Sequence, residues 1–308
     1  MNLEQFKSPY GIHQSVNWLW RFFRGGDFKN PENIYDVAKS VTLRETNHDC
    51  QLIFVGDLMG TTGKKIRFSD SISSFVKGCD FLIANLEGPL IDKDDIVFVK
   101  QYNHPRFLSD LDHLLPLNKW VFGLANNHVF DYGEKGLTST CRRLEESGSQ
   151  YFGLRYRPTF SYSGIHVVGA TEIQNWPCSH VMTYRDLETV NDPQKTILFL
   201  HWGKEFEFYP KKDQTSHRQI KYQRFPKIIG HHSHTPQPIE FINNSLTAYS
   251  LGNLYIYFNK KMLRYGKILK LSFSKSELVK IEWQWTFTEL VTDKELQVGL
   301  IDECPLFS

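Results

Sequence analysis

The sequence has few cysteines, and they form no recognisable pattern. There are five, an odd number, and no two are spaced as CxxC. They are Cys50, Cys79, Cys141, Cys178 and Cys304. A disulfide framework needs paired cysteines, and a zinc finger needs closely spaced ones. The sequence therefore argues against both and predicts reduced thiols in a cytosolic protein.

Long apolar runs, targeting patterns and basic runs are also lacking. No stretch reaches the ~18 apolar residues of a membrane-spanning helix, and the opening MNLEQFKSPYGIHQ shows no charged-then-apolar signal pattern. The formal net charge is only +2, whereas a nucleic-acid binder normally carries a basic face. We therefore expect a cytoplasmic protein with no transmembrane segment and no nucleic-acid partner.

One segment near the N-terminus is rich in aromatic residues. Residues 15–26 read SVNWLWRFFRGG, so apolar side chains cover most of a short helix, with Arg21 and Arg24 beside them. Such a helix either packs its aromatic residues onto the domain or lies on a membrane surface. Because the apolar residues are not confined to one face, we favour packing. A weak contact of residues 15–24 with a membrane surface is the alternative.

The pattern along the chain predicts an α/β fold with mixed sheets. Apolar residues make up 41% and charged residues 23% of the 308 residues, which is ordinary globular usage and enough chain for one large domain or two small ones. Over the first two thirds, short apolar strands alternate with helical segments such as 133–148. The last third is mostly strand, and hairpin turns are expected at Ser163-Gly164 and Asn243-Asn244.

We divide the chain into three parts. Residues 1–49 are polar, are punctuated by glycine and proline, and form an N-terminal appendage. Residues 50–290 form the main domain. Residues 291–308 form a C-terminal tail, in which DKELQVGLIDE is expected to be a last helix.

Five predicted strands end in polar residues. These residues are Asp57, Asn85, Glu87, Asn127, His128, His201 and the histidines of GHHSH, which are His231, His232 and His234. Ligands of open α/β sheets bind beyond the carboxyl ends of the strands, so we expect these side chains to share one site. Carboxylate oxygen and imidazole nitrogen are ligands that suit Zn, Mn or Fe.

Each of these residues also has an ordinary structural explanation. An aspartate at a strand end is commonly a turn residue or a helix cap. The pair Asn126-Asn127 could form a loop that tolerates left-handed backbone. His201 could be a satisfied core histidine, and the histidine cluster could be a solvated turn before Pro236. The combination favours a metal site, because every candidate directly follows an apolar strand.

The same motifs resemble a known family. GD, NLEGP, LANNHVFDYGEKGL, LHWGKE, IIGHHSHTPQPIE and YSLGNL occur in the order found in the CapA family of capsule or poly-γ-glutamate synthesis proteins. That family is related to the calcineurin-like metallophosphoesterases. The resemblance covers about residues 51–258. It implies a four-layer α/β/β/α sandwich of two mixed sheets flanked by helices, with 50–290 as a CapA-like metallophosphatase domain.

The resemblance also implies a set of ligands for one or two divalent metal ions (Mn, Zn or Fe). Asp57 matches the first ligand, and Glu87 or Asn85 stands at the position of a bridging carboxylate. The further ligands that it implies are Asn127, His201, His232 and His234. Because GHH leaves the alignment ambiguous by one position, His231 could replace His232.

The implied catalytic residues are His128, which matches an imidazole that protonates the leaving group, and Asp57, which supplies negative charge to the ions. Met59 departs from the pattern, because the wider superfamily has a histidine there and a thioether is a poor ligand beside oxygen donors. CapA proteins are commonly anchored or exported. This chain shows no anchor, so a role in capsule export does not follow.

We therefore predict a metal-dependent hydrolase that cleaves a phosphoester with a metal-activated water. The alternatives are an enzyme that acts on amide or γ-glutamyl bonds of a capsule polymer, and a non-catalytic protein that binds or scaffolds an anionic polymer. The substrate is expected to be an anionic small molecule or polymer. Residues expected to contact it are Glu205, Asn253 and Tyr249, with Arg155 or Arg157 as further candidates.

Overall fold

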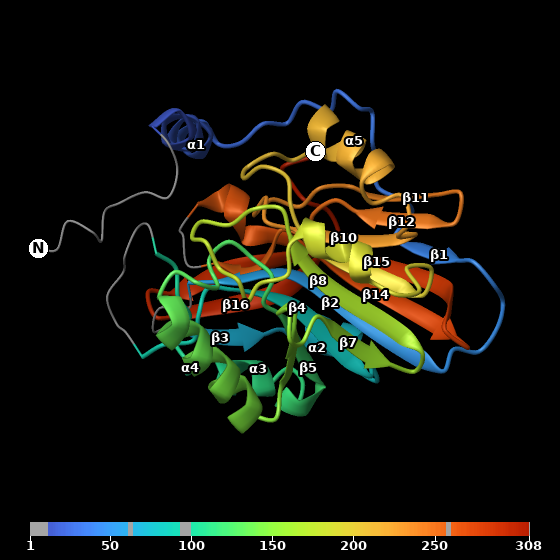
Figure 1. Ribbon diagram of the computed structural model, residues 1–308, viewed down its shortest axis with the longest axis horizontal. Helices are drawn as coiled ribbons and strands as arrows, with labels where there is room; N and C mark the ends of the chain where they lie inside the picture. The colour runs from blue at the N-terminus through green and yellow to red at the C-terminus, as the bar shows by residue number, and fades with distance from the viewer. Residues whose placement is uncertain (1–11, 61–63, 93–99, 257–259, 308) are drawn as a thin grey trace, which may run out of the picture.

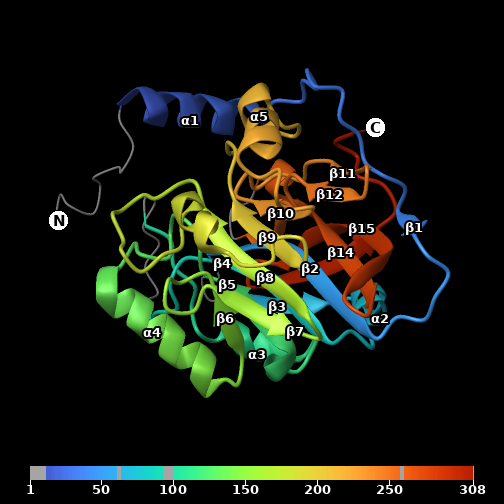
Figure 2. The ribbon, with the colours of Figure 1, turned by 45° about the vertical axis from the view of Figure 1, so that its right-hand side comes forward.

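The computed structural model describes residues 12–60, 64–92, 100–256 and 260–307. Two mixed β-sheets lie against each other, and helices lie on the outside (Figures 1 and 2). This arrangement confirms the predicted α/β sandwich of two mixed sheets.

In the described residues the larger sheet has ten strands and joins a parallel part to an antiparallel part. The parallel strands are β2 (Cys50–Met59), β4 (Phe81–Glu87), β5 (Trp120–Gly123) and β6 (Gln150–Phe152). The antiparallel strands are β14 (Tyr265–Ser274), β15 (Glu277–Thr292), β16 (Glu295–Ile301) and β1 (Ser40–Thr42). Two short strands, β3 (Lys65–Phe68) and β13 (Asn253–Ile256), pair in parallel with β16 and β2.

The smaller sheet has six strands in the order β11-β12-β10-β9-β8-β7. Its four inner strands run parallel and are β8 (Ile165–Thr171), β9 (Thr196–His201), β10 (Lys227–His231) and β12 (Ser245–Ala248). Antiparallel hairpins add the edge strands β7 (Thr159–Tyr162) and β11 (Ile239–Ile242). Positive φ angles at Ser163, Asn243 and Asn244 confirm both predicted hairpin turns.

The core between the sheets is apolar and contains Phe54, Ile83, Phe152, Phe199 and Ile229. Strands β2, β4, β9 and β10 are buried along almost their whole length. A parallel strand covered on both faces needs apolar residues throughout rather than in alternation. This requirement explains why the sequence shows these strands as short continuous apolar runs.

Helices cover the outer faces of the sheets. The larger sheet packs against α2 (Asp70–Val76), α3 (Phe107–Asp112) and α4 (Gly133–Glu146). In α4 the buried residues Leu137, Cys141 and Leu144 recur at helical spacing and form its inner face. The smaller sheet packs against the 3-10 helix η3 (Tyr184–Thr189) and the residues that follow α5 (Lys212–Ile220). The short 3-10 helices η2 (Leu117–Lys119) and η4 (Lys261–Arg264) complete the elements.

The C-terminal tail corrects one prediction. A helix was expected within residues 291–308, but residues 295–301 form strand β16, which pairs with β15 on one side and β3 on the other. Leu296 and Val298 point into the core at strand spacing. Pairing on both sides therefore outweighs the helical propensity of the charged residues around Glu295.

The N-terminal segment is tied to both sheets. Asp36 accepts a hydrogen bond from the buried Lys267 Nζ at 2.5 Å and another from the backbone N–H of Ile239 at 2.7 Å. The Lys267 ammonium also lies over the rings of Trp283 and Trp285. These contacts hold the chain that leads from the first helix against the sheets.

The first helix, α1 (Ile12–Arg24), shows both behaviours considered for the aromatic segment. Trp18 and Phe22 pack against an apolar cluster of the domain. On the other side Val16, Trp20 and Phe23 are 58–74% exposed. None of the helices in the described part of the chain combines the length and apolar character that a membrane span requires. Contact with a membrane surface stays a prediction.

Candidate metal centre

Four strand ends from the two sheets meet at one place. Asp57 lies near the end of β2 and Glu87 at the end of β4, whereas His201 ends β9 and His231 ends β10. The loop after β10 adds two further histidines. We use the term metal centre for the six residues Asp57, Glu87, His201, His231, His232 and His234. All six are at most 4% exposed.

The backbone around Gly56 sets the position of Asp57. Up to Val55, strand β2 pairs with β14, and from Asp57 onward it pairs with β13. The backbone N–H of Asp57 donates to the carbonyl of Gly252 at 2.9 Å. A Cβ atom on Gly56 would lie 1.9 Å from that same carbonyl oxygen. Only glycine allows this approach, so Gly56 fixes the place from which the carboxylate projects.

A shared amide holds the two carboxylates. Asn85 Nδ2 donates to Asp57 Oδ1 at 2.7 Å and to Glu87 Oε2 at 3.4 Å. Asn126 Nδ2 donates to the Asn85 amide oxygen at 3.1 Å. Asp57 Oδ2 also accepts the backbone N–H of His232 at 3.2 Å. Asn85 thus turns its N–H groups toward the carboxylates, and its role as a metal ligand stays a prediction.

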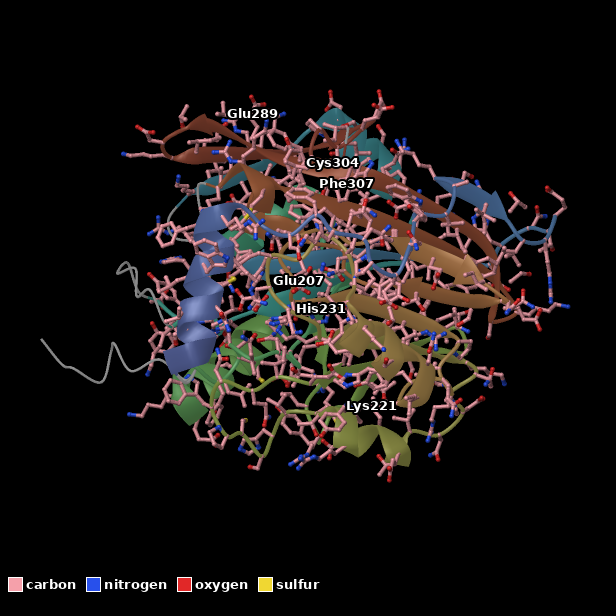
Figure 3. All side chains as sticks on the ribbon, turned by 90° about the horizontal axis from the view of Figure 1, so that it is seen from above. Glu207, Lys221, His231, Glu289, Cys304 and Phe307 are labelled. Atoms are coloured by element: carbon pink, nitrogen blue, oxygen red, sulfur yellow. The ribbon has the colours of Figure 1, made fainter. Side chains whose placement is uncertain are left out.

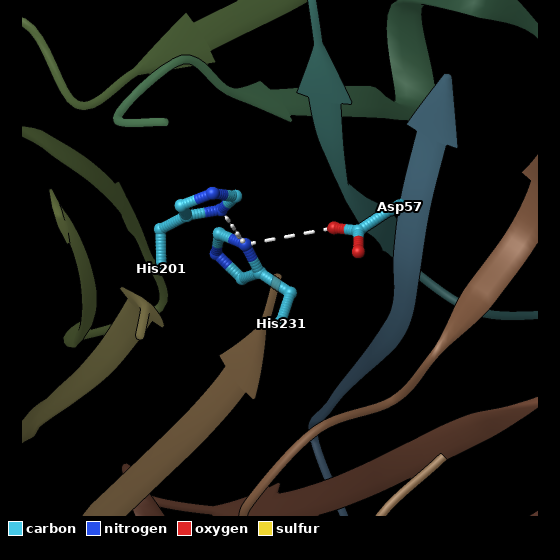
Figure 4. A group of neighbouring side chains, drawn as sticks. All are labelled: Asp57, His201 and His231. Atoms are coloured by element: carbon cyan, nitrogen blue, oxygen red, sulfur yellow. Dashed lines mark hydrogen bonds and ion pairs between the residues drawn. The ribbon is translucent and has the colours of Figure 1, made fainter. Parts of the chain in front are cut away.

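The imidazoles approach the carboxylates from the opposite sheet. The Nδ1 atoms of His201 and His231 are 2.8 Å apart, and both rings point toward Asp57 (Figure 4). His234 Nδ1 lies 3.2 Å from Asp57 Oδ2. His232 and His234 both have positive φ angles, of 100° and 55°. Such angles are strained for residues other than glycine, and strain of this kind concentrates at functional sites.

The donor atoms fit a bound cation. Three overlapping groups of ligand atoms lie within 4.8 Å of one another, and they are Asp57–His201–His231, Glu87–His201–His232 and Asp57–Glu87–His234. Three of the buried donor atoms form no hydrogen bond in the described part of the chain: Glu87 Oε1, His231 Nε2 and His232 Nδ1. Buried polar atoms are normally satisfied. Carboxylate and imidazole donors left without partners are suited to a divalent ion.

Burial and mutual charge shift the pKa values within the centre. Burial raises the pKa of Glu87 to about 8. Burial acts to lower the pKa of His234, but Glu87 and Asp57 raise it to about 10. Burial lowers the pKa of His231 to about 4, and it holds the pKa values of His201 and His232 well below normal. Three of the four imidazoles are therefore neutral, which is the form that binds a metal.

His128 forms a buried pair with Asp131 beside the centre. Its Nδ1 lies 2.7 Å from Asp131 Oδ2. Asp131 also accepts the backbone N–H of Gln101 at 2.7 Å and the indole N–H of Trp176 at 3.1 Å. Burial acts to lower the pKa of His128, but the charge and hydrogen bond of Asp131 raise it overall. Asp131 thus favours the imidazolium form and leaves Nε2 as the nitrogen that faces away from the pair.

Amides link this pair to the centre. Asn127 Oδ1 accepts a hydrogen bond from His201 Nε2 at 2.7 Å, and its Nδ2 donates to Asn175 Oδ1 at 3.3 Å. Asn175 Nδ2 in turn lies 3.3 Å from His128 Nδ1. Sequence reasoning missed Asn175 and Asp131. The spacing of three residues from His128 to Asp131 was a usable signal, whereas the loop that carries Asn175 offered none.

The residues predicted to contact substrate lie in different surroundings. Glu205 is buried, and Oε2 accepts the indole N–H of Trp18 at 2.5 Å. Both polar side-chain atoms of Asn253 contact His234. Asn253 Oδ1 lies 3.0 Å from His234 Nδ1, and Asn253 Nδ2 donates to the His234 carbonyl at 2.9 Å. Tyr249 stacks on Trp202 and makes no ion pair or hydrogen bond with the metal centre within the described residues. Substrate contacts by these three residues stay predictions.

The remaining candidates lie elsewhere. Arg155 forms a two-point contact with Asp186, and Arg157 pairs with Glu145. Met59 is buried in an apolar cluster with Phe206 and Phe208, so its thioether serves packing. All five cysteines are buried and free, as predicted.

A two-sheet α/β sandwich with a buried aspartate, glutamate and histidine centre at its strand ends defines a metallophosphoesterase-like protein. A family comparison agrees with this class. The model of the bacterial capsule synthesis protein PGA_cap family matches residues 51–173 and 170–257, and the chain belongs to that family.

Individual relatives are more distant. The chain is similar to a capsule biosynthesis protein CapA of Bacillus anthracis, with 25% identity over 256 residues, 71% of this chain and 62% of the relative. A PGA biosynthesis protein CapA of Bacillus subtilis is 25% identical over 233 residues, 65% of this chain and 61% of the relative. A probable polyglutamine synthesis accessory protein of Mycobacterium tuberculosis is 26% identical over 211 residues, 57% of this chain and 55% of the relative. The match thus spans less than two thirds of each relative.

Proposed function

We propose that this protein is a metal-dependent hydrolase that cleaves a phosphoester at the metal centre. The observation that carries the proposal is the set of six buried donors at converging strand ends, three of whose atoms have no hydrogen-bond partner in the described residues. The six residues would hold one or two divalent ions. A bound ion of this kind lowers the pKa of a water molecule and polarises a phosphoryl oxygen.

The residues of the chain itself would bind, orient and protonate the substrate. His128 would hold a proton at Nε2 and donate it to the leaving oxygen, an effect of typically 10²–10⁴-fold in rate. Asp131 supports this role because its bond to Nδ1 orients the ring and favours the charged form. Asn127 would hold His201 in place through the 2.7 Å bond between them.

The names of the relatives support an anionic polymer or a precursor of one as the substrate. They refer to capsule, PGA and polyglutamine synthesis. Because polymers of glutamine or glutamate are joined by amide bonds, hydrolysis of an amide or γ-glutamyl bond is the second candidate. The third is a binding or scaffold protein, which the apolar Met59 at the edge of the centre favours.

Elemental analysis combined with turnover tests the proposal. Wild type, His232→Ala and the exposed control His48→Ala would be purified and analysed for Mn, Zn and Fe before and after incubation with Mn. The same samples would be assayed on p-nitrophenyl phosphate, bis-p-nitrophenyl phosphate and γ-glutamyl-p-nitroanilide. We expect metal and phosphoester turnover to fall together in His232→Ala only.

The other outcomes separate the candidates. If wild type binds metal but turns over only γ-glutamyl-p-nitroanilide, the proposed reaction becomes amide hydrolysis. Metal with no turnover of any probe would favour the binding protein. Wild type with less than stoichiometric metal after incubation would refute the metal centre.

A further inference from the structure

Helix α1 is tied to the loop that follows β9. Besides the bond from Trp18 to Glu205, Arg21 Nη1 lies 3.7 Å from Glu207 Oε1. Lys260 Nζ donates to the carbonyl of Phe22. Seen from above, α1 runs along one end of the molecule, and the labelled residues Glu207 and His231 lie inward of it (Figure 3). The helix therefore contacts the two loop carboxylates with one cationic side chain, Arg21, and with the indole N–H of Trp18.

The surface on which α1 packs is apolar and adjoins the metal centre. The rings of Trp18 and Phe22 stack with centroids 5.2 Å apart, and both meet Phe206 edge-on or tilted, at 5.5 and 5.6 Å. Phe206 shares this cluster with Met59, two residues beyond Asp57 on β2. The backbone N–H of Phe206 donates to the Ser233 carbonyl at 2.8 Å, between two histidines of the centre. Packing of α1 thus fixes the loop directly beside the histidine turn.

Glu205 is a buried carboxylate of this loop, directly before Phe206, whose N–H bonds to the histidine turn. Burial and the closer charged groups of the centre dominate the pKa shifts of Glu87, His128 and His234, and the charge of Glu205 adds a smaller upward contribution to each. Oε2 is held by Trp18, whereas Oε1 takes no hydrogen bond from any residue that the structure describes. A carboxylate can only accept hydrogen bonds, and it repels other anions.

We propose that Glu205 and Trp18 form a subsite that selects substrates with a hydrogen-bond donor, best a protonated amine, next to the scissile bond. This inference rests on the proposed hydrolase function. Glu205 is the specificity-determining residue, because Oε1 would accept from the substrate amine. Trp18 is a positioning residue, because its N–H fixes the carboxylate through Oε2. A phosphoester with a second anionic group at this position would be disfavoured.

A matched pair of substrates isolates the subsite. Ethyl phosphate and 2-aminoethyl phosphate differ by one ammonium group, and release of inorganic phosphate gives kcat/KM for each. The ratio of the two values in a variant, divided by the ratio in wild type, cancels the difference between the leaving groups. We expect wild type to prefer 2-aminoethyl phosphate, and Glu205→Gln to reduce the ratio on the order of tenfold, because a charge-assisted hydrogen bond is lost.

Two tryptophan variants test the positioning role. Trp18→Phe keeps an aromatic ring at the position and removes the N–H together with part of the ring area, so the ratio should fall several-fold, mainly through KM for the amine. Trp20→Phe alters the same helix at a residue that is 65% exposed and should leave the ratio unchanged. A merely structural role of Trp18 would lower kcat/KM equally for both esters and would overturn its assignment.

Binding distinguishes failure of this inference from failure of the proposed function. If wild type turns over both esters but Glu205→Gln keeps its ratio, the subsite is refuted and the hydrolase stands. If neither ester is turned over, the affinity of Mn-loaded protein for the same two esters decides by calorimetry. A preference for 2-aminoethyl phosphate that Glu205→Gln abolishes would support the subsite, and equal affinities would overturn it.

Discussion

Replacing Gly56 by alanine tests how the fold places the first carboxylate of the centre. The added Cβ would lie 1.9 Å from the Gly252 carbonyl oxygen, whereas ordinary contact begins near 3.4 Å, so β2 and β13 must separate by about 1.5 Å. That movement breaks the bond from the Asp57 N–H to Gly252 and displaces the carboxylate. Metal sites tolerate displacements of only about 0.2 Å. We therefore expect metal affinity to fall about 100-fold or more.

Stability should fall as well, by about 3 kcal/mol, because overpacking and a lost buried hydrogen bond act together. Urea unfolding would measure the free energy, and calorimetric titration with Mn the affinity. Gly78→Ala is the matched control, since its Cβ meets nothing within 4 Å and only the positive φ of 82° is strained. That strain costs about 1 kcal/mol and leaves the centre intact. Wild-type metal affinity in folded Gly56→Ala would refute the reasoning.

Four further predictions follow from contacts of the site and of the N-terminal segment. Asp131→Asn should lower kcat by about 10² or more while metal content stays at the wild-type level, because the His128 ring loses its orienting charge; equal loss of metal would contradict this. Removal of metal by EDTA should lower Tm, and added Mn should restore it in wild type but not in His232→Ala, because the ion binds only the folded chain. Asp36→Ala should destabilise the protein by about 3 kcal/mol, more than Lys267→Met, because it leaves a buried ammonium without its carboxylate. Burial lowers the pKa of Lys267 below 10.5, so the unfolded chain binds this proton more tightly. The free energy of unfolding of wild type should therefore increase as the pH rises from the folded pKa of Lys267 to 10.5. Urea unfolding at pH 7 and pH 9.5 would measure this increase, which should be absent in Lys267→Met.

The strand ends of the site were predictable because they obey a local rule. Asp57 and Glu87 close short apolar runs on neighbouring parallel strands of the larger sheet, and His201 closes one in the smaller sheet. Parallel strands of a sheet end at a common edge. The structure brings them together as expected. The sequence left open whether His231 or His232 belongs to the site, and the structure brings in both. Strand β10 ends at His231, and the strained turn after it carries His232.

Residues that act through contacts distant in sequence could not be found in this way. The bond from Trp18 to Glu205 joins residues 187 positions apart, and that from Asn127 to Asn175 joins residues 48 apart. No periodicity or motif records such pairs. The wrong helix at 291–308 has a related cause, because β16 is a strand only through its pairing with β15 and β3.

The division of donors between the two sheets affects the order in which the protein assembles. The carboxylates belong to the larger sheet, whereas all four imidazoles come from the smaller sheet and the turn after it. A bound ion would cross-link the two sheets at their strand ends. The N-terminal strands alone cannot supply this set of donors, so the complete centre forms only after residue 234 has been synthesised and the sheets have packed. Metal content would then report correct docking of the two halves of the sandwich.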